Sequence, residues 1–293
     1  MTFFLQQMLS GLATGFIYAG LALALSVVFE GTGVLNFAQG ELAAFSALLA
    51  WTFLSIGMSF WLAFALTVVA SFGMGVVIER VLIRPVEQAP HLTILIVTLA
   101  LMLGVNALSG LFWGFIGKSV ASPFGEGAVR LIGAAVTRPQ IGIAGVILAT
   151  LLVVGAFYRY TTLGLMIRAA AMNPLSSRYL GINVGWMLAI GWGIAAAVGA
   201  VAGIISAPIT GVSPDTMSGT LLLAFAAFTL GGVGSRLGAV VGGLIVGLLT
   251  NLAITYIPFL QGDLANMVPF ALIIAVLYLR PQGLFGRRLA VRS

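Results

Sequence analysis

The chain has no cysteine and only one histidine, His91, among its 293 residues. The lack of cysteine excludes disulfides, thiolate nucleophiles and thiolate metal sites, and one histidine cannot form a multi-histidine metal site. The seven acidic residues are scattered, so they can form neither a metal cluster nor a catalytic triad. These absences predict a protein that is not an enzyme and that holds no cofactor or metal.

The glycine-rich stretches do not form a nucleotide site. The segment 114–119, GFIGKS, is similar to the end of a phosphate-binding loop, but that motif requires glycine at 112, where Phe112 stands. The segment 231–235, GGVGS, falls short of GxGxxG because position 237 is leucine. Any ATP-driven activity must therefore receive its energy from a partner.

Charged residues are also rare. They make up 7% of the chain, against about a quarter of a soluble domain, whereas 61% of the residues are hydrophobic. An open sheet cannot satisfy its backbone in lipid, so we predict an all-α, polytopic membrane helix bundle in the lipid bilayer, one transmembrane domain over 1–293. About eight to nine crossings fit the charge-free windows, which approach or exceed the ~20 residues of a span: 1–29, 42–78, 92–117, 139–158, 179–214, 216–235, 237–262 and 264–279.

Two stretches interrupt the apolar pattern in the same order. Residues 21–41 and 221–242 each contain an apolar run, a GxG break and a second run with glycines. In the first stretch, Gly31 and Gly33 are expected to break the helix. Helix breaks at membrane depth occur where the backbone is buried in protein or lines a wet cavity. We therefore expect broken or re-entrant segments, as in transporters built from two related halves.

The net charge of +6 comes from basic residues whose positions along the chain indicate how the protein is oriented in the membrane. The basic residues are spread between spans and do not form a patch with interleaved aromatics, so no nucleic-acid partner is expected. If the segment 159–185 is cytoplasmic, the segment at about 117–138 is an external loop. Its only basic residues are Lys118, Arg130 and Arg138. The rule that cytoplasmic loops are basic then places the C-terminus in the cytoplasm. Ten arginines lie on that side: Arg80, Arg84, Arg159, Arg168, Arg178, Arg236, Arg280, Arg287, Arg288 and Arg292.

The segment 159–185 carries local start and stop signals for helices. Asn173 can cap a helix whose first residue is Pro174, and Gly181 can adopt the left-handed conformation that ends it. This pattern predicts a short helix over 174–180, preceded by another over 163–171 with Arg168 on its polar side. The pair can form a docking surface, or the segment can be an ordinary basic cytoplasmic loop.

A second polar segment, residues 30–41, includes the first glycine break; Glu30 precedes the break, and Asn36, Gln39 and Glu41 follow it. Asn36 and Gln39 are three residues apart and can share a helix face; Glu41 is about 140° from Asn36. Solutes such as amino acids need polar groups along their route. We expect Asn36 and Gln39 to border the translocation pathway or its gate, and Glu41 to brace a neighbouring chain or helix. The alternative is that all three only satisfy backbone groups freed by the break, and that Glu30 lies in an interfacial turn.

Several motifs resemble those of ABC-importer permeases for branched-chain amino acids, of the LivH type. The loop TLGLMIRAAAMNPLSSRYLGIN contains the pattern Gly164, Arg168, Asn173, Gly181 and Asn183. Three other stretches are similar in the same order: 15–41, the glycine-rich 231–247, and RPQGLFGRR at 280–288. The family often has histidine where this chain has Gln39, which leaves the solute open.

This resemblance implies a permease of the bacterial plasma (inner) membrane for branched-chain or other hydrophobic amino acids or related small solutes. It implies a second related permease subunit, two cytoplasmic ATPase subunits and a periplasmic or extracellular solute-binding protein. The short helix is then a coupling helix. The alternative is a stand-alone channel or secondary transporter, for which only Glu41 could serve as a coupling carboxylate. The residues expected to couple to the ATPase are Gly164, Arg168, Asn173, Pro174, Ser177, Arg178 and Gly181.

Overall fold

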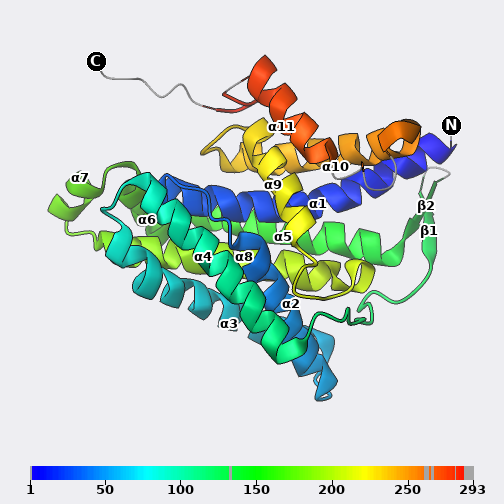
Figure 1. The fold of residues 1–293 in the computed structure, drawn as a ribbon, viewed down its shortest axis with the longest axis horizontal. Helices are drawn as coiled ribbons and strands as arrows, with labels where there is room; N and C mark the ends of the chain where they lie inside the picture. The colour runs from blue at the N-terminus through cyan, green and yellow to red at the C-terminus, as the bar shows by residue number, and fades with distance from the viewer. Residues whose placement is uncertain (1, 132–133, 261–263, 265–266, 281, 287–293) are drawn as a thin grey trace.

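The computed structural model describes residues 2–131, 134–260, 264, 267–280 and 282–286, so Arg287, Arg288 and Arg292 of the predicted cytoplasmic tail lie outside the described residues. Six of the described helices are long and apolar enough to cross a bilayer (Figure 1). They are α1 (Thr2–Thr32), α3 (Phe60–Ile78) with its π and 3-10 extension to Val86, α4 (His91–Trp113), α5 (Arg138–Tyr160), α8 (Val184–Thr210) and α10 (Arg236–Tyr256).

Shorter elements complete the bundle. They are α2 (Gln39–Ser55), α6 (Thr162–Met172), α7 (Pro174–Tyr179), α9 (Ser218–Gly231), a 3-10 turn (Pro258–Leu260) and α11 (Met267–Leu279). The prediction of an all-α, polytopic membrane protein is confirmed, whereas the count of eight to nine crossings stays a prediction because α2, α9 and α11 are each shorter than a full span.

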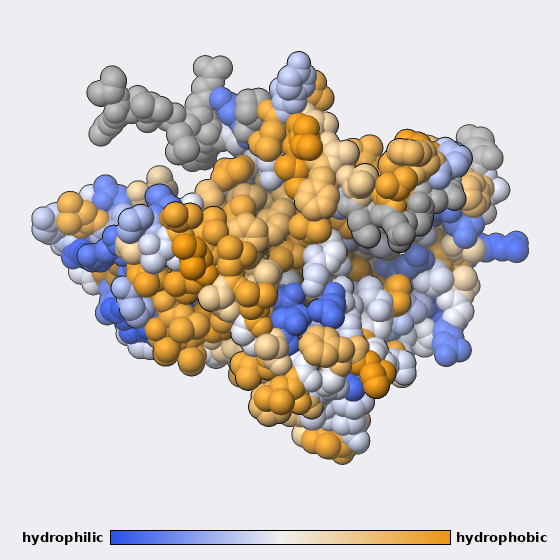
Figure 2. All heavy atoms as spheres, in the orientation of Figure 1, coloured by the Kyte–Doolittle hydropathy of each residue, from blue (hydrophilic) through white to orange (hydrophobic). Residues whose placement is uncertain are grey.

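Helices α1 and α8 form the centre of the bundle. The most apolar windows of these two helices are 72% and 83% buried, whereas those of α3, α4 and α5 are only 22–28% buried. The outer helices turn apolar side chains such as Leu103 and Val153 outward, 66% and 67% exposed. Figure 2 shows the result, a mostly hydrophobic middle between two more hydrophilic ends. This distribution suits a protein surrounded by lipid.

The two ends differ in structure. At one end of the long axis lies α7, and at the other lies a hairpin of β1 (Ala128–Leu131) and β2 (Ala134–Thr137), in which Ala128 pairs with Thr137 (Figure 1). We call these the α7 end and the hairpin end. Gln140 donates a hydrogen bond to Ser10 at 3.1 Å, which places the start of α1 at the hairpin end. The hairpin was not predicted; it can form in the segment 117–138 because water satisfies its outer edges beyond the lipid.

Close contact between α1 and α10 depends on small residues. A Cβ at Gly15 would lie 3.0 Å from Leu244, and a Cβ on Gly247 would collide with the backbone of Gly15. Gly11 and Gly15 in α1 are four residues apart, as are Gly243 and Gly247 in α10, which is the spacing expected for helices that approach closely in lipid. Larger side chains would separate α1 from α10.

The first glycine break is shorter than predicted. Gly31 remains in α1, and the chain leaves the helix only at Gly33, where φ is +69°. The expectation that Gly31 breaks the helix is therefore wrong: glycine weakens a helix without ending it, and the positive φ is needed at one position only. Six residues, 33–38, connect α1 to α2.

Candidate functional site

The helices at the α7 end are capped by neighbouring side chains. Thr161 accepts a hydrogen bond from the Gly164 amide at 3.0 Å and begins α6, and Asn173 accepts one from the Ser176 amide at 2.9 Å and begins α7. Gly181 follows α7 with φ at +80°. The start, stop and approximate lengths of both predicted helices are confirmed.

Helix α7 projects from the bundle and is largely exposed. Leu175, Tyr179 and Leu180 are 62%, 83% and 78% exposed, and Arg178 is exposed beside them. Ser177 is instead buried and faces the bundle. The end of the molecule thus presents an apolar surface with a basic group, which a protein partner could cover.

A cleft of about 710 Å³ adjoins α7. One wall is the loop after α3, with Arg84, Glu87 and Gln88, and the other is the turn from Arg178 to Gly185. Close by, the Arg80 guanidinium lies 3.7 Å from the centre of the Trp186 ring, which fixes the π-helical extension of α3 (Glu79–Ile83) to the start of α8. The two walls of the cleft are therefore attached to the membrane-spanning helices α3 and α8.

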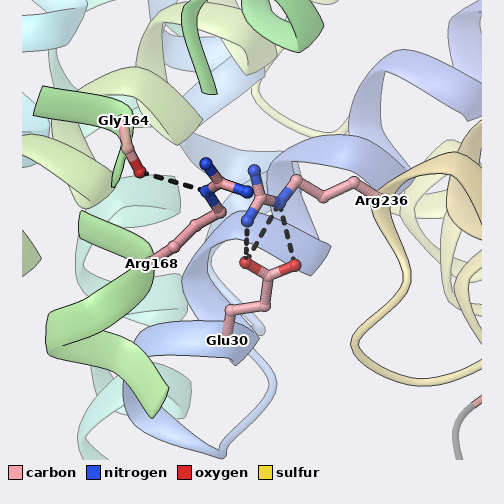
Figure 3. A network of polar contacts seen from close by, with 4 residues as sticks. All are labelled: Glu30, Gly164, Arg168 and Arg236. Atoms are coloured by element: carbon pink, nitrogen blue, oxygen red, sulfur yellow. Dashed lines mark hydrogen bonds and ion pairs between the residues drawn. The ribbon is translucent and has the colours of Figure 1, made fainter. Parts of the chain in front are cut away.

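Arg168, which the sequence places on the polar side of α6, turns toward the bundle. It is partly buried, and its Nε donates to the Gly164 carbonyl at 3.4 Å. Figure 3 shows its side chain extending toward an ion pair between Glu30 and Arg236. Gly164 is buried because α6 packs against the end of α5, where a Cβ would collide with the backbone of Phe157. Arg168 and Gly164 thus connect the α7 end to the bundle.

The ion pair between Glu30 and Arg236 joins the two glycine breaks. Arg236 Nη2 lies 2.6 Å and Nε 2.8 Å from the Glu30 carboxylate oxygens, and the guanidinium lies 3.9 Å from the centre of the Tyr158 ring. An arginine that holds a carboxylate through two nitrogens gives a strong, directional contact. Sequence reasoning missed this pair, although each break carries one charged residue of opposite sign.

Asn36 and Gln39 contact each other, but only Gln39 lies in α2, so the two do not share a helix face as their spacing predicts. Both are 1% exposed. The Asn36 amide donates to Gln39 at 3.2 Å, its oxygen accepts from the Ala38 amide at 3.1 Å, and Gln39 donates to the Ala195 carbonyl in α8 at 3.1 Å. Their polar groups thus stabilise the connection from α1 to α2 and attach it to the central helix.

Glu41 lies at a contact between three segments. Its carboxylate accepts hydrogen bonds from Ser218 in α9 at 3.0 Å and from Asn106 in α4 at 3.1 Å, and Asn106 also donates to Asp215 at 2.9 Å. We call these four residues the Glu41 junction. Sequence reasoning found Glu41 but not its partners, which are uncharged or lie in a loop far along the chain.

The comparisons with known proteins agree with this architecture. Residues 7–277 match the family described as branched-chain amino acid transport system / permease component. The chain belongs to this family. As a permease component, the protein is the membrane subunit of an ABC transport system and not the ATPase.

Relatives of the permease match it over nearly the whole length. It is 32% identical to LivH, the high-affinity branched-chain amino acid transport system permease protein of Escherichia coli, over 97% of this chain and 96% of that protein. It is 31% identical to the permease protein BraD of Pseudomonas aeruginosa, with the same two coverages. Among solved structures, the chain titled PsaBC from Streptococcus pneumoniae in complex with Fab has a TM-score of 0.50 over 95% of this permease and 92% of that chain. At 14% identity, that likeness concerns the fold alone.

Proposed function

We propose that this permease imports branched-chain or other hydrophobic amino acids, or related small solutes, across a bacterial plasma membrane. The full-length similarity to LivH and BraD carries the proposal, since both are named for branched-chain amino acid transport. The partners would be a second related permease subunit, two ATPase subunits and a periplasmic or extracellular solute-binding protein. Two or three of the helices α2, α9 and α11 would add partial or tilted crossings to the six long helices, which gives eight to nine in total.

In this proposal the α7 end lies in the cytoplasm and contacts the ATPase. The exposed apolar side chains of α7, with Arg178, support a protein partner here. The exposed residues Asn173, Pro174, Arg178 and Gly181 would shape the contact surface. Gly164, Arg168 and Ser177 would transmit its movement, since they face the bundle. ATP-driven closure would then move α7 as a rigid lever.

The orientation can be tested with single cysteines because the chain has none of its own. Ser176→Cys, on the exposed side of α7, should react only with membrane-permeant thiol reagents. Ala121→Cys, in the exposed segment before the hairpin, should react with impermeant reagents. The opposite labelling pattern in intact cells would reverse the proposed topology.

Transport itself is tested by reconstitution. The permease, purified with its ATPase and permease partners, should accumulate leucine in proteoliposomes only with ATP and the solute-binding protein. Uptake by the isolated chain, without ATPase subunits, would instead support a channel or secondary transporter and contradict the proposal.

For the pathway, we propose that Asn36 and Gln39 form a gate where α2 begins and that Glu41 braces α4 and α9. The contact of Gln39 with the middle of α8 supports a gate that moves with the central helix. Gln39→Leu should change the uptake rate or the preference among leucine, isoleucine and valine. If both stay unchanged in an assembled complex, the two residues serve only the connection from α1 to α2.

A further inference from the structure

The Glu41 junction is the meeting point of two short helices. α2 begins at Gln39 and α9 at Ser218, and a Cβ at Gly40 would lie 3.0 Å from Leu221. Neither helix is capped by the side chain of the residue before it. Instead, Glu41 lies in the first turn of α2 and accepts its hydrogen bond from the first residue of α9. Carboxylates are favourable at such helix starts.

The junction carries two carboxylates without a basic partner. Within the part of the chain that the structure describes, the arginines in ion pairs are Arg80 with Glu79 and Arg236 with Glu30, and neither involves Glu41 or Asp215. Lys118 pairs through its backbone with Val212 in the same loop as Asp215, but its ammonium lies 4.6 Å from the centre of the Trp51 ring. The local charge is therefore negative.

This negative group lies within the span and yet reaches the surface. Asn106 has residues 91–105 of α4 before it and 107–113 after it, so it lies about 10 Å along the helix from the end of α4. Glu41 is 5% exposed, but Asp215 and Ser218 are exposed. Figure 2 shows a hydrophilic patch near the centre of this face, bordered by hydrophobic atoms on the side of the α7 end and by paler atoms toward the hairpin end.

An exposed carboxylate at this depth cannot face hydrocarbon, since charged side chains in a membrane face protein interiors or water-filled cavities. We propose that the surface formed by Asp215, Ser218 and the next turn of α9 lines the water-filled passage of the importer, and that its negative charge favours cationic groups there. This inference rests on the proposed import function. It places the solute's ammonium group, and not its carboxylate, nearest to this chain at the Glu41 junction.

The absence of cysteine allows a direct test in the complete importer in membrane vesicles. Ser218→Cys and Leu222→Cys lie one helical turn apart on α9, and the second is deeper in the span. Val153→Cys in α5 is the matched control, because Val153 is 67% exposed within a span and has apolar neighbours. The probes are impermeant methanethiosulfonates, one cationic and one anionic, with modification read on this chain after purification.

Both α9 cysteines should react, while Val153→Cys should not. The ratio of cationic to anionic reaction rates should exceed that at Ala121→Cys in the exposed loop. Asp215→Asn, added to Leu222→Cys, should lower this ratio by roughly threefold to tenfold, since one charge acts with opposite sign on the two reagents.

If neither α9 cysteine reacts, while Ala121→Cys in an otherwise identical complex does, then this surface of α9 does not face water and the inference is wrong. An unchanged ratio after Asp215→Asn would overturn the preference for cations. The parent importer separates these outcomes from a failure of the proposed function: if it takes up leucine with ATP while the α9 cysteines resist, only this inference is wrong. Absence of ATP-driven uptake in the parent would count against the function itself.

Discussion

The α6–α7 segment and the Glu41 junction hold polar groups on the same apolar bundle in opposite ways. In the α6–α7 segment, Thr161 and Asn173 bond amides three residues away. At the junction, Glu41 bonds Asn106 and Ser218, which are 65 and 177 positions away. The first arrangement is stable wherever water covers it, whereas the second exists only when three segments pack together. Substitutions should therefore act locally on α7 and globally at the junction.

The largest effect should come from removing the Glu41 carboxylate. Glu41→Ala removes the acceptor of the Ser218 hydroxyl and the Asn106 amide, and a hydrogen bond to a charged group contributes about 1.5–3 kcal/mol. The apparent melting temperature of the purified complex should fall, and assembly with the second permease should weaken. Glu41→Gln keeps an acceptor of the same shape and should lose less. Equal stability of the alanine and wild-type proteins would show that the junction does not hold the helices together.

A smaller global effect is expected at the ion pair. Arg236→Ala leaves Glu30 without its charge partner, and hydrogen bonds to charged groups contribute about 1.5–3 kcal/mol. We expect a lower melting temperature, with partial recovery in the charge-swapped variant Glu30→Arg, Arg236→Glu. If the swap is no more stable than Arg236→Ala, then the stacking of Arg236 on Tyr158 contributes more than the ion pair.

At Gly181 the effect should be local. A Cβ there would have no neighbour within 4 Å, so Gly181→Val acts through its backbone alone. The left-handed conformation costs an ordinary residue about 1–2 kcal/mol. ATP-driven uptake should fall while the melting temperature of the bundle stays nearly constant. Gly181→Asn, which tolerates this conformation, is the control. A global loss of stability would show that α7 and the bundle unfold together.

The smallest effect should follow the loss of the Asn173 cap. Asn173→Ala should cost about 1 kcal/mol of local helix stability. Faster amide hydrogen exchange over 175–180 is the measurement. Asn173→Asp keeps an acceptor and should exchange like the wild type. Unchanged exchange in the alanine variant would mean that Pro174 and the contact with α8 suffice to hold α7.

The sequence by itself determined the apolar spans and the two short helices predicted over 163–171 and 174–180, the second with its Asn173 cap. These features follow from composition and from residues within one helical turn of each other. Only the tertiary structure decided that Gly31 stays helical, that Arg168 turns toward the Glu30–Arg236 pair, and that Glu41 meets Asn106 and Ser218. In a uniformly apolar chain, many pairings of spans look equivalent. The choice among them depends on close packing, as between Gly15 and Gly247, and on polar groups that find partners only after the helices have packed.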